Sequence, residues 1–470
     1  MEFHAVILCG HGHRLSPFSS VRSSGLPKAL LPVANRPLLA HVLDWCGEDT
    51  FSGITIVAPH DYVNEFKYFL EEVYLKEKRP RNTAVVGTSL EHSGEVIAEL
   101  IQSRLNPPHS DFIVLPCDFI SEVPVSSFID AYRSRDKDVI ATGVYYRNAV
   151  ETIEKKSLVT DYLVHTPLTN KCPRLLDSNT RDAVSDHKGM PVRTEMLWKY
   201  PNSVISSDIL SASAFLCSGS LLDLINNNKI QVTGKSWAKV MRDVARRSWK
   251  HSHRGQEEDD QPKSLLLQLL PQGSLFIRAN TVPAYVEANR HVMRQLARQN
   301  AAAPKKQSQP GAAAIGGDSA VGEDSAVGEK SSVKRTVVGN NCTIGRKCRL
   351  TGCVVMDNVT IEDDVILENC VVGRKASIGA KARLTSCHVE GGYEVPAGAH
   401  IKNETLQNLT MESLMEGAEY DDDEDDDDDV SEDYSDDDDD DDDDGDSQGE
   451  WEQSEGEGID ADEEDDLFER

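Results

Sequence analysis

Residues that could bind phosphate follow the first apolar segment of the chain. A buried strand is predicted at Ala5–Cys9, and the turn after it contains Gly10 and Gly12, with Arg14 next and Lys28 further on. Backbone amides of a glycine-containing turn can approach a phosphate closely, and an arginine and a lysine can neutralise its charge. Such a turn alone is a weak signal, so it indicates a candidate phosphate loop and no particular reaction.

The elements that would position this turn alternate between strands and helices over the first half of the chain. Further strands are predicted at Ile54–Ala58, Phe112–Leu115 and Val139–Val144, and helices at Leu38–Cys46, Val63–Val73 and Gly94–Arg104. This order is typical of a Rossmann-like α/β domain with a mostly parallel sheet, whose ligand crevice lies at the C-terminal ends of the strands. The glycine turn would therefore lie at the rim of that crevice.

A second kind of organisation begins at Val321, where the sequence repeats every 17 residues as far as Thr405. In five successive blocks, positions 1, 7 and 13 are always Val, Ile or Leu. This spacing suits three short strands per turn, each directing one aliphatic side chain into a common core, whereas a helix or a hairpin sheet would need another period. A single turn cannot bury its own core, so the turns must stack. The repeat predicts a left-handed parallel β-helix over 315–405, with Ile315 in the lead-in to the first turn.

The net charge of −31 is concentrated at the C-terminal end. From Glu419 to Arg470 there are 33 acidic residues and one basic residue, whereas the remainder holds 47 acidic and 48 basic residues. Runs of like charge repel themselves and cannot bury a core, so residues 419–470 are predicted to be a disordered acidic tail. The tail would repel phosphates, which argues against direct nucleic-acid binding. It could be a solvating spacer or could attract a basic partner surface.

Composition also suggests the remaining boundaries. An α/β domain is expected over 1–298, with a charged insertion at about 247–263 and a last helix at Val282–Leu296, and a linker is expected over 299–314. The 10 cysteines show no C-x-x-C pair and no secretory framework. Neither a signal peptide nor an apolar run of the roughly 20 residues that a membrane span needs is present. A soluble protein of the cytosol, with no membrane partner, is therefore expected.

The glycine turn and the segment Pro27-Lys28-Ala29-Leu30-Leu31-Pro32-Val33 together resemble the signature of the sugar-nucleotide pyrophosphorylases. That family joins an N-terminal nucleotidyltransferase domain to a C-terminal left-handed β-helix. The resemblance implies that Arg14 and Lys28 handle the triphosphate and the developing pyrophosphate. It also implies that Asp118 corresponds to an aspartate that binds magnesium. An alternative role for Asp118 is a cap at the end of a strand.

Three departures from this family indicate that the fold is kept while the active site has eroded. The turn is one residue shorter and contains two histidines, and Ser19–Gly25 lengthens the segment before Lys28. Cys117 stands where the family has a glycine before its aspartate, and no Glu-Lys-Pro sugar-binding motif is found. We therefore expect no catalytic residue, no metal and no cofactor. A vestigial nucleotide-binding site is expected at Gly10, Gly12, Arg14, Lys28 and Asp118.

Four strings resemble the gamma-subunit family of eukaryotic translation initiation factor 2B more closely. They are Met1-Glu2-Phe3, CDFISEV at Cys117–Val123, RANTVPAYVEANR at Arg278–Arg290 and GEKSSVKRTVVG at Gly328–Gly339. Their combination is specific because all four occur in order along nearly the whole chain, the acidic tail and the insertion excepted. The complex to which this family belongs is the guanine-nucleotide exchange factor for translation initiation factor 2.

The resemblance implies a hetero-decamer of alpha, beta, gamma, delta and epsilon subunits, with the GTPase translation initiation factor 2 as substrate. The gamma and epsilon subunits pair, and the epsilon subunit catalyses exchange with an additional C-terminal helical-repeat domain. The acidic segment of this chain shows no helical periodicity, so such a domain is not expected here. The chain is therefore expected to be a non-catalytic regulatory subunit that pairs with the epsilon-like catalytic subunit.

The sequence leaves two alternative functions open. They are a sugar-1-phosphate nucleotidyltransferase, such as a mannose-1-phosphate guanylyltransferase, and a hexapeptide acyltransferase, which is disfavoured.

Two groups of side chains in this sequence are of types that can bind a metal ion. His11 and His13 lack a nearby third ligand, so loop residues or a vestigial phosphate contact are favoured over a metal site. Cysteines spaced by 17 residues should stack in successive turns as small polarisable side chains, with a soft-metal or redox role as the lesser alternative; they are Cys353, Cys370 and Cys387.

Overall fold

The structure is a computed structural model of the 470-residue chain. It describes residues 3–408 apart from 48–49, 75–81, 105–109, 151, 154–156, 251–262 and 301–312. The expected acidic tail at 419–470 lies outside the described residues, as do most of the expected insertion and most of the expected linker.

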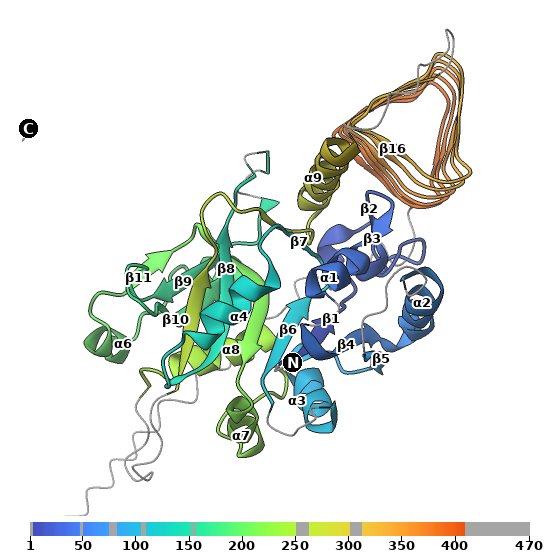
Figure 1. The fold of residues 1–470 in the computed structure, drawn as a ribbon. Helices are drawn as coiled ribbons and strands as arrows, with labels where there is room; N and C mark the ends of the chain where they lie inside the picture. Colours follow the sequence, from blue (N-terminus) through green and yellow to red (C-terminus); the bar gives the residue numbers. More distant parts are fainter. Residues whose placement is uncertain are drawn as a thin grey trace, which may run out of the picture. The chain divides into compact units, whose positions relative to one another are not determined.

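A ten-stranded sheet forms the centre of the α/β part, in the order β11-β9-β10-β13-β8-β12-β6-β1-β4-β5 (Figure 1). Its strands are β1 Phe3–Leu8, β4 Phe51–Pro59, β5 Thr83–Thr88, β6 Phe112–Pro116, β8 Val139–Arg147, β9 Asp161–His165, β10 Arg174–Thr180, β11 Val204–Ser206, β12 Ile209–Cys217 and β13 Ser264–Leu269. The Rossmann-like α/β class is confirmed, but the sheet is mixed rather than mostly parallel. Strands β5, β4, β1 and β6 are parallel, whereas β12 runs antiparallel to both β6 and β8. Short connections such as the one from β9 to β10 join neighbouring strands, which makes those pairs antiparallel.

Helices cover both faces of this sheet. One core contains residues of α1 Leu38–Cys46, α2 Val63–Tyr68 and α4 Val125–Arg133, and the other contains residues of α3 Ser93–Arg104, α7 Ser220–Asn226 and α8 Trp237–Arg246. Successive side chains of a strand point to opposite faces. Accordingly Ile113 and Leu115 lie in the first core, whereas Phe112 and Val114 lie in the second.

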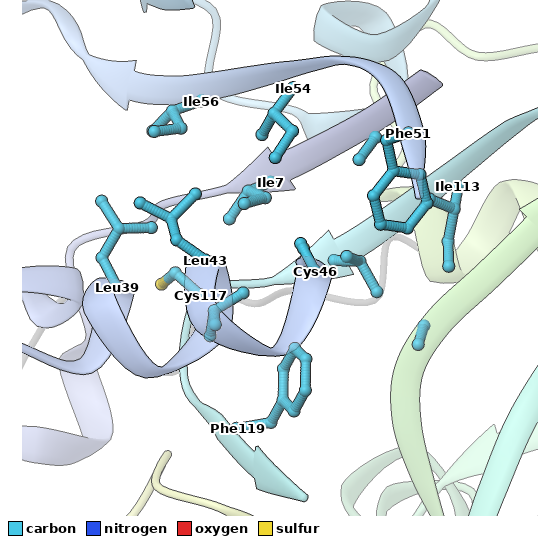
Figure 2. Close-up of a cluster of buried hydrophobic side chains, with 14 of the residues drawn as sticks. Ile7, Leu39, Leu43, Cys46, Phe51, Ile54, Ile56, Ile113, Cys117 and Phe119 are labelled. Atoms are coloured by element: carbon cyan, nitrogen blue, oxygen red, sulfur yellow. The ribbon is translucent and has the colours of Figure 1, made fainter. Parts of the chain in front are cut away.

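Helix α1 has the bounds that the sequence predicts, and it packs on the parallel strands. Leu39, Leu43 and Cys46 lie on one face of the helix and pack against Ile7 and Ile54 of the sheet (Figure 2). Full burial of one such aliphatic side chain stabilises the fold by about 1.5–3 kcal/mol. The segment predicted as a helix at Val63–Val73 instead divides into α2 and a following π-helical turn, Phe69–Tyr74. Two short helices, α5 Arg181–Asp186 and α6 Thr194–Lys199, lie in the peripheral part of the domain.

The C-terminal repeat forms three parallel sheets, which is the predicted left-handed β-helix (Figure 1). One sheet contains β15 Ala314–Ile315, β18 Ser332–Lys334, β21 Arg349–Thr351, β24 Ile366–Glu368, β27 Arg383–Thr385 and β30 His400–Lys402. The second contains β16 Ala320–Val321, β19 Val337–Val338, β22 Val354–Val355, β25 Val371–Val372, β28 His388–Val389 and β31 Thr405–Leu406. The third contains β17 Ala326–Val327, β20 Thr343–Ile344, β23 Thr360–Ile361, β26 Ser377–Ile378 and β29 Glu394–Val395.

The register of the β-helix follows the 17-residue period. Leu350 pairs with Leu367, and Leu367 pairs with Leu384, so the predicted aliphatic positions stack directly on one another. All three side chains are fully buried. Ile315 pairs with Val333 and is half exposed, as expected for a lead-in at the open end of the stack.

Smaller elements connect these parts. They are the hairpin β2 Pro32–Val33 and β3 Arg36–Pro37, the antiparallel pair β7 Phe119–Ser121 and β14 Phe276–Arg278, and the helix α9 Val282–Asn300. Tyr285 and Val292 of α9 share a buried cluster with Val33 of the hairpin and with Val337 and Val354 of the β-helix. Among the helices that the structure describes, none is both long and apolar enough to cross a membrane.

Candidate functional site

The candidate site lies at the C-terminal ends of β1 and β6. These strands are parallel neighbours, with Leu8 opposite Pro116, so the glycine turn and Asp118 follow strands that end at the same edge of the sheet. Lys28 begins a short 3-10 helix, Lys28–Leu30, and its Nζ lies 2.9 Å from Oδ2 of Asp118. Two of the five residues expected from the sequence are therefore in direct contact.

A third charged residue completes the site. Arg278 donates from Nε to Oδ1 of Asp118 at 3.0 Å and from Nη2 to Oδ2 at 3.1 Å, which makes the pair bidentate. Its Nη1 also donates to the hydroxyl of Ser213. Backbone pairing fixes this arrangement, because Arg278 lies opposite Phe119 in the β7–β14 pair and the amide of Ala279 donates to the carbonyl of Asp118 at 2.7 Å.

Burial and charge together determine the ionisation of this cluster. The Asp118 side chain is 0% exposed, and those of Lys28 and Arg278 are 15% and 14% exposed. Burial would raise the pKa of Asp118, but the charges and hydrogen bonds of Arg278 and Lys28 outweigh it and hold this pKa well below its usual range. Burial likewise opposes the charge of Lys28, whose pKa is nevertheless raised by Asp118. At neutral pH the cluster is therefore a charged, buried ion triad.

The surroundings of Asp118 do not fit the magnesium ion that the pyrophosphorylase resemblance implies. Mg²⁺ requires oxygen ligands at about 2.0–2.1 Å and usually keeps several waters. Both carboxylate oxygens of Asp118 accept hydrogen bonds from cationic nitrogens, and the side chain has no exposed surface.

The glycine turn has a packing role in this structure. Gly12 adopts a φ of +82°, and a Cβ there would lie 2.9 Å from the Cβ of Lys28. Gly12 is therefore required both by its left-handed conformation and by the lysine stem packed against it. Gly10 is exposed, and no other atom lies within 4 Å of where its Cβ would be. Arg14 lies in the 3-10 helix His13–Leu15 and is exposed, whereas the triad is buried.

Two thiols lie beneath the triad. Cys9 and Cys117 follow β1 and β6, both are buried, and the Cys117 side chain points into the core under α1 (Figure 2). Burial is the main cause that raises the pKa of Cys9. The pKa of Cys117 is lowered, first by the hydrogen bond that Cys9 donates and also by the nearby charge of Lys28, against the effect of burial.

The other histidines and cysteines singled out in the sequence have structural explanations. The ring centroids of His11 and His13 are 6.3 Å apart and both residues are exposed. Within the described residues, no group of three or more His, Cys, Asp or Glu side chains is arranged to hold a metal ion. The stacked thiols each donate to the carbonyl two residues earlier, at 3.3–3.4 Å, in the contacts Cys353–Thr351, Cys370–Glu368 and Cys387–Thr385. Thr336 makes the same contact one turn earlier, so this position selects a small donor at a corner of the β-helix.

Neither Arg278 nor Ser213 was predicted from the sequence to belong to this site. Arg278 is the first residue of the string at Arg278–Arg290, to which no role was given, and a buried carboxylate at Asp118 requires a cationic partner. Ser213 gives no comparable signal, because a bulge in β12 between Ser211 and Ala214 positions it.

Each of the two parts of the chain matches a different protein-family model. A family model described as a MobA-like NTP transferase domain matches residues 5–182. Another, described as the EIF2B subunit epsilon LbH domain, matches residues 298–402. Translation initiation factor eIF2B subunit gamma of Schizosaccharomyces pombe is 27% identical over 232 residues, which cover 49% of this chain and 48% of that relative. The match thus spans about half the length of each protein.

Proposed function

We propose that this eIF2B gamma-like chain is a non-catalytic regulatory subunit of a guanine-nucleotide exchange factor for translation initiation factor 2. The observation that carries the proposal is that two matches are to eIF2B subunits, one to an epsilon-subunit domain over residues 298–402 and one to a gamma subunit over about half of the chain. The proposed partners are an epsilon-like catalytic subunit and alpha, beta and delta subunits, with translation initiation factor 2 as the substrate GTPase. The proposed location is the cytosol.

The architecture is suited to binding rather than to chemistry. We propose that residues 1–298 and 315–405 act as two domains, and that both contribute to pairing with the epsilon-like subunit. Stacked turns of a β-helix offer extended sheet faces and open ends to a partner. We further propose that Gly10, Gly12, Arg14, Lys28 and Asp118 are the remnant of a nucleotide-binding site, in which Lys28 and Asp118 now contact each other.

Reconstitution tests this function. The chain and an epsilon-type subunit from the same organism are produced separately and together, and release of fluorescent GDP from translation initiation factor 2 is measured. We expect the chain alone to leave the rate at its spontaneous value, and the co-purified pair to exceed the epsilon-type subunit alone. Exchange by the isolated chain would contradict the proposal, as would a chain that neither co-purifies with the epsilon-type subunit nor changes its exchange rate.

A sugar-1-phosphate nucleotidyltransferase is the second candidate. The match of residues 5–182 to a MobA-like NTP transferase domain favours it, whereas the internal pairing of Asp118 argues against it. Incubation of the purified chain with mannose 1-phosphate, GTP and magnesium separates the two functions. Release of pyrophosphate would support the enzyme, and we expect none above the level of a Lys28→Met control.

The acidic residues at 419–470 suggest an electrostatic contribution to partner binding. We propose that they attract a lysine-rich segment of translation initiation factor 2, because clustered charge steers the encounter of oppositely charged surfaces. Removal of 419–470 should lower the affinity at low salt and flatten its dependence on salt concentration. Unchanged affinity and salt dependence would leave these residues as a solvating spacer.

A further inference from the structure

We propose that Arg278 is the resident cation of the Asp118 site. Its guanidinium takes the position in which a divalent cation would neutralise the carboxylate. The Arg278–Asp118 ion pair is therefore structural, and no metal ion binds at this edge of the sheet. Ligands of α/β sheets ordinarily bind at the C-terminal ends of the strands, and Asp118 lies there. The proposal does not depend on the exchange function above, because metal binding is measured on the chain alone.

The geometry of the pair explains why a metal would not displace Arg278. A guanidinium is planar and always charged, and its two parallel N–H groups match the two oxygens of a carboxylate. Arg278 uses this fork on Asp118 at 3.0 and 3.1 Å. Mg²⁺ gives up its waters reluctantly, so it would have to lose hydration and break two charge-assisted hydrogen bonds to reach Asp118.

The local charge also opposes a further cation. Lys28 holds Oδ2 of Asp118 at 2.9 Å, so one buried carboxylate already faces two fixed positive charges. A divalent ion in contact with Asp118 would lie beside both of them, where low solvent exposure leaves the repulsion poorly screened. The triad therefore has an excess of positive charge before any metal arrives.

The segment that carries Arg278 is itself firmly held. Phe276 stacks on Phe119 with ring centroids 5.4 Å apart and an interplanar angle of 10°. The ring centroid of Tyr146 lies 4.8 Å from that of Phe276. Four residues after Arg278 the helix α9 begins at Val282. The ion pair thus connects the end of β6 to the segment that leads into α9 and stabilises this edge of the sheet.

Iron-directed cleavage tests the proposal at the level of individual sites. Fe²⁺ with ascorbate and hydrogen peroxide cuts the backbone near bound iron, and mass spectrometry locates each cut on the full-length chain. The acidic residues at 419–470 are an internal positive control, since carboxylate clusters attract divalent cations. We expect wild-type protein to show no cut within residues 116–120 or 276–280 that excess Mg²⁺ suppresses. Such a cut, lost in Asp118→Asn, would overturn the proposal.

Matched variants complete the test. Arg278→Met frees Oδ1 of Asp118, and we expect new Mg²⁺-suppressed cuts at 116–120 that are absent from Arg278→Met combined with Asp118→Asn. Arg278→Lys keeps a positive charge and should show no such cuts. If Arg278→Met melts cooperatively and still shows no new cut, Arg278 is not what excludes the metal and the proposal fails. If Arg278→Met does not fold, the wild-type measurement decides alone.

Discussion

The side-chain Oδ1 of Asn289 accepts a hydrogen bond from the backbone amide of Ala34 at 2.9 Å, across 255 residues of sequence. Ala34 has a φ of 51°, so its amide belongs to a tight left-handed turn between β2 and β3. Asn289 is 1% exposed and also donates to the carbonyl of Tyr285 at 3.0 Å. One buried amide side chain therefore fixes the hairpin on α9.

Replacement of Asn289 by Ala should destabilise this junction. The amide of Ala34 would be left buried without its acceptor, which costs about 1–3 kcal/mol. We expect the free energy of unfolding, measured by urea titration with circular dichroism, to fall by that amount. Gln299→Ala on the exposed end of α9 is the control and should change it by less than about 0.5 kcal/mol. Equal effects of the two substitutions would contradict this assignment.

The Asp118–Arg278 pair predicts strong coupling between two substitutions. Asp118→Asn leaves two cations without their carboxylate, and removal of one partner from a buried pair costs about 3–5 kcal/mol. Arg278→Met should cost a similar amount, although Lys28 still compensates Asp118. The double variant should be destabilised by about 1–3 kcal/mol less than the sum of the two, as found for contacting residues. A double-mutant cycle from urea unfolding measures this, and strict additivity would show that the contact does not contribute.

The same carboxylate predicts a dependence of stability on pH. The pKa of Asp118 is lower in the folded protein than its value of about 3.9 in an unfolded chain. Its contribution is therefore present above about pH 4 and is lost as the pH falls towards the folded pKa. The difference in unfolding free energy between wild type and Asp118→Asn should be constant above about pH 5 and shrink below about pH 4. A difference that grew in acid would mean that Asp118 is not held ionised.

Local features of the sequence were sufficient to predict the β-helix, but only four of the ten strands of the central sheet, and they did not indicate that Arg278 completes the site. The β-helix repeats its own pattern every 17 residues, so Leu350, Leu367 and Leu384 could be placed without knowledge of distant contacts. The Asp118–Arg278 contact spans 160 residues and depends on the pairing of β7 with β14, for which three-residue strands give almost no local signal. The prediction of a mostly parallel sheet was wrong for a related reason. Strand β12 lies between β6 and β8, which both precede it in the chain, and runs antiparallel to each.

Thiol reactivity should separate one cysteine from the rest. Cys172 is partly exposed, whereas the other nine cysteines are buried. We expect Ellman's reagent to modify about one thiol rapidly in the native protein and all ten after denaturation, because buried thiols are inert. Cys172→Ser should abolish the rapid phase. A rapid phase that survives this substitution would show that at least one of the other nine thiols is accessible.

The position of a residue along the β-helix should determine the cost of truncating it. Leu367 is fully buried between turns, so Leu367→Ala should destabilise the β-helix by about 2–5 kcal/mol. Ile401 lies in the last strand of the same sheet and is partly exposed, so Ile401→Ala should cost less, about 1 kcal/mol. Each turn contacts only its neighbours, so Leu367→Ala should accelerate amide hydrogen exchange most in β21, β24 and β27. An equal rise of exchange in the α/β sheet would contradict this local effect, because it would show that the β-helix and the α/β part unfold together.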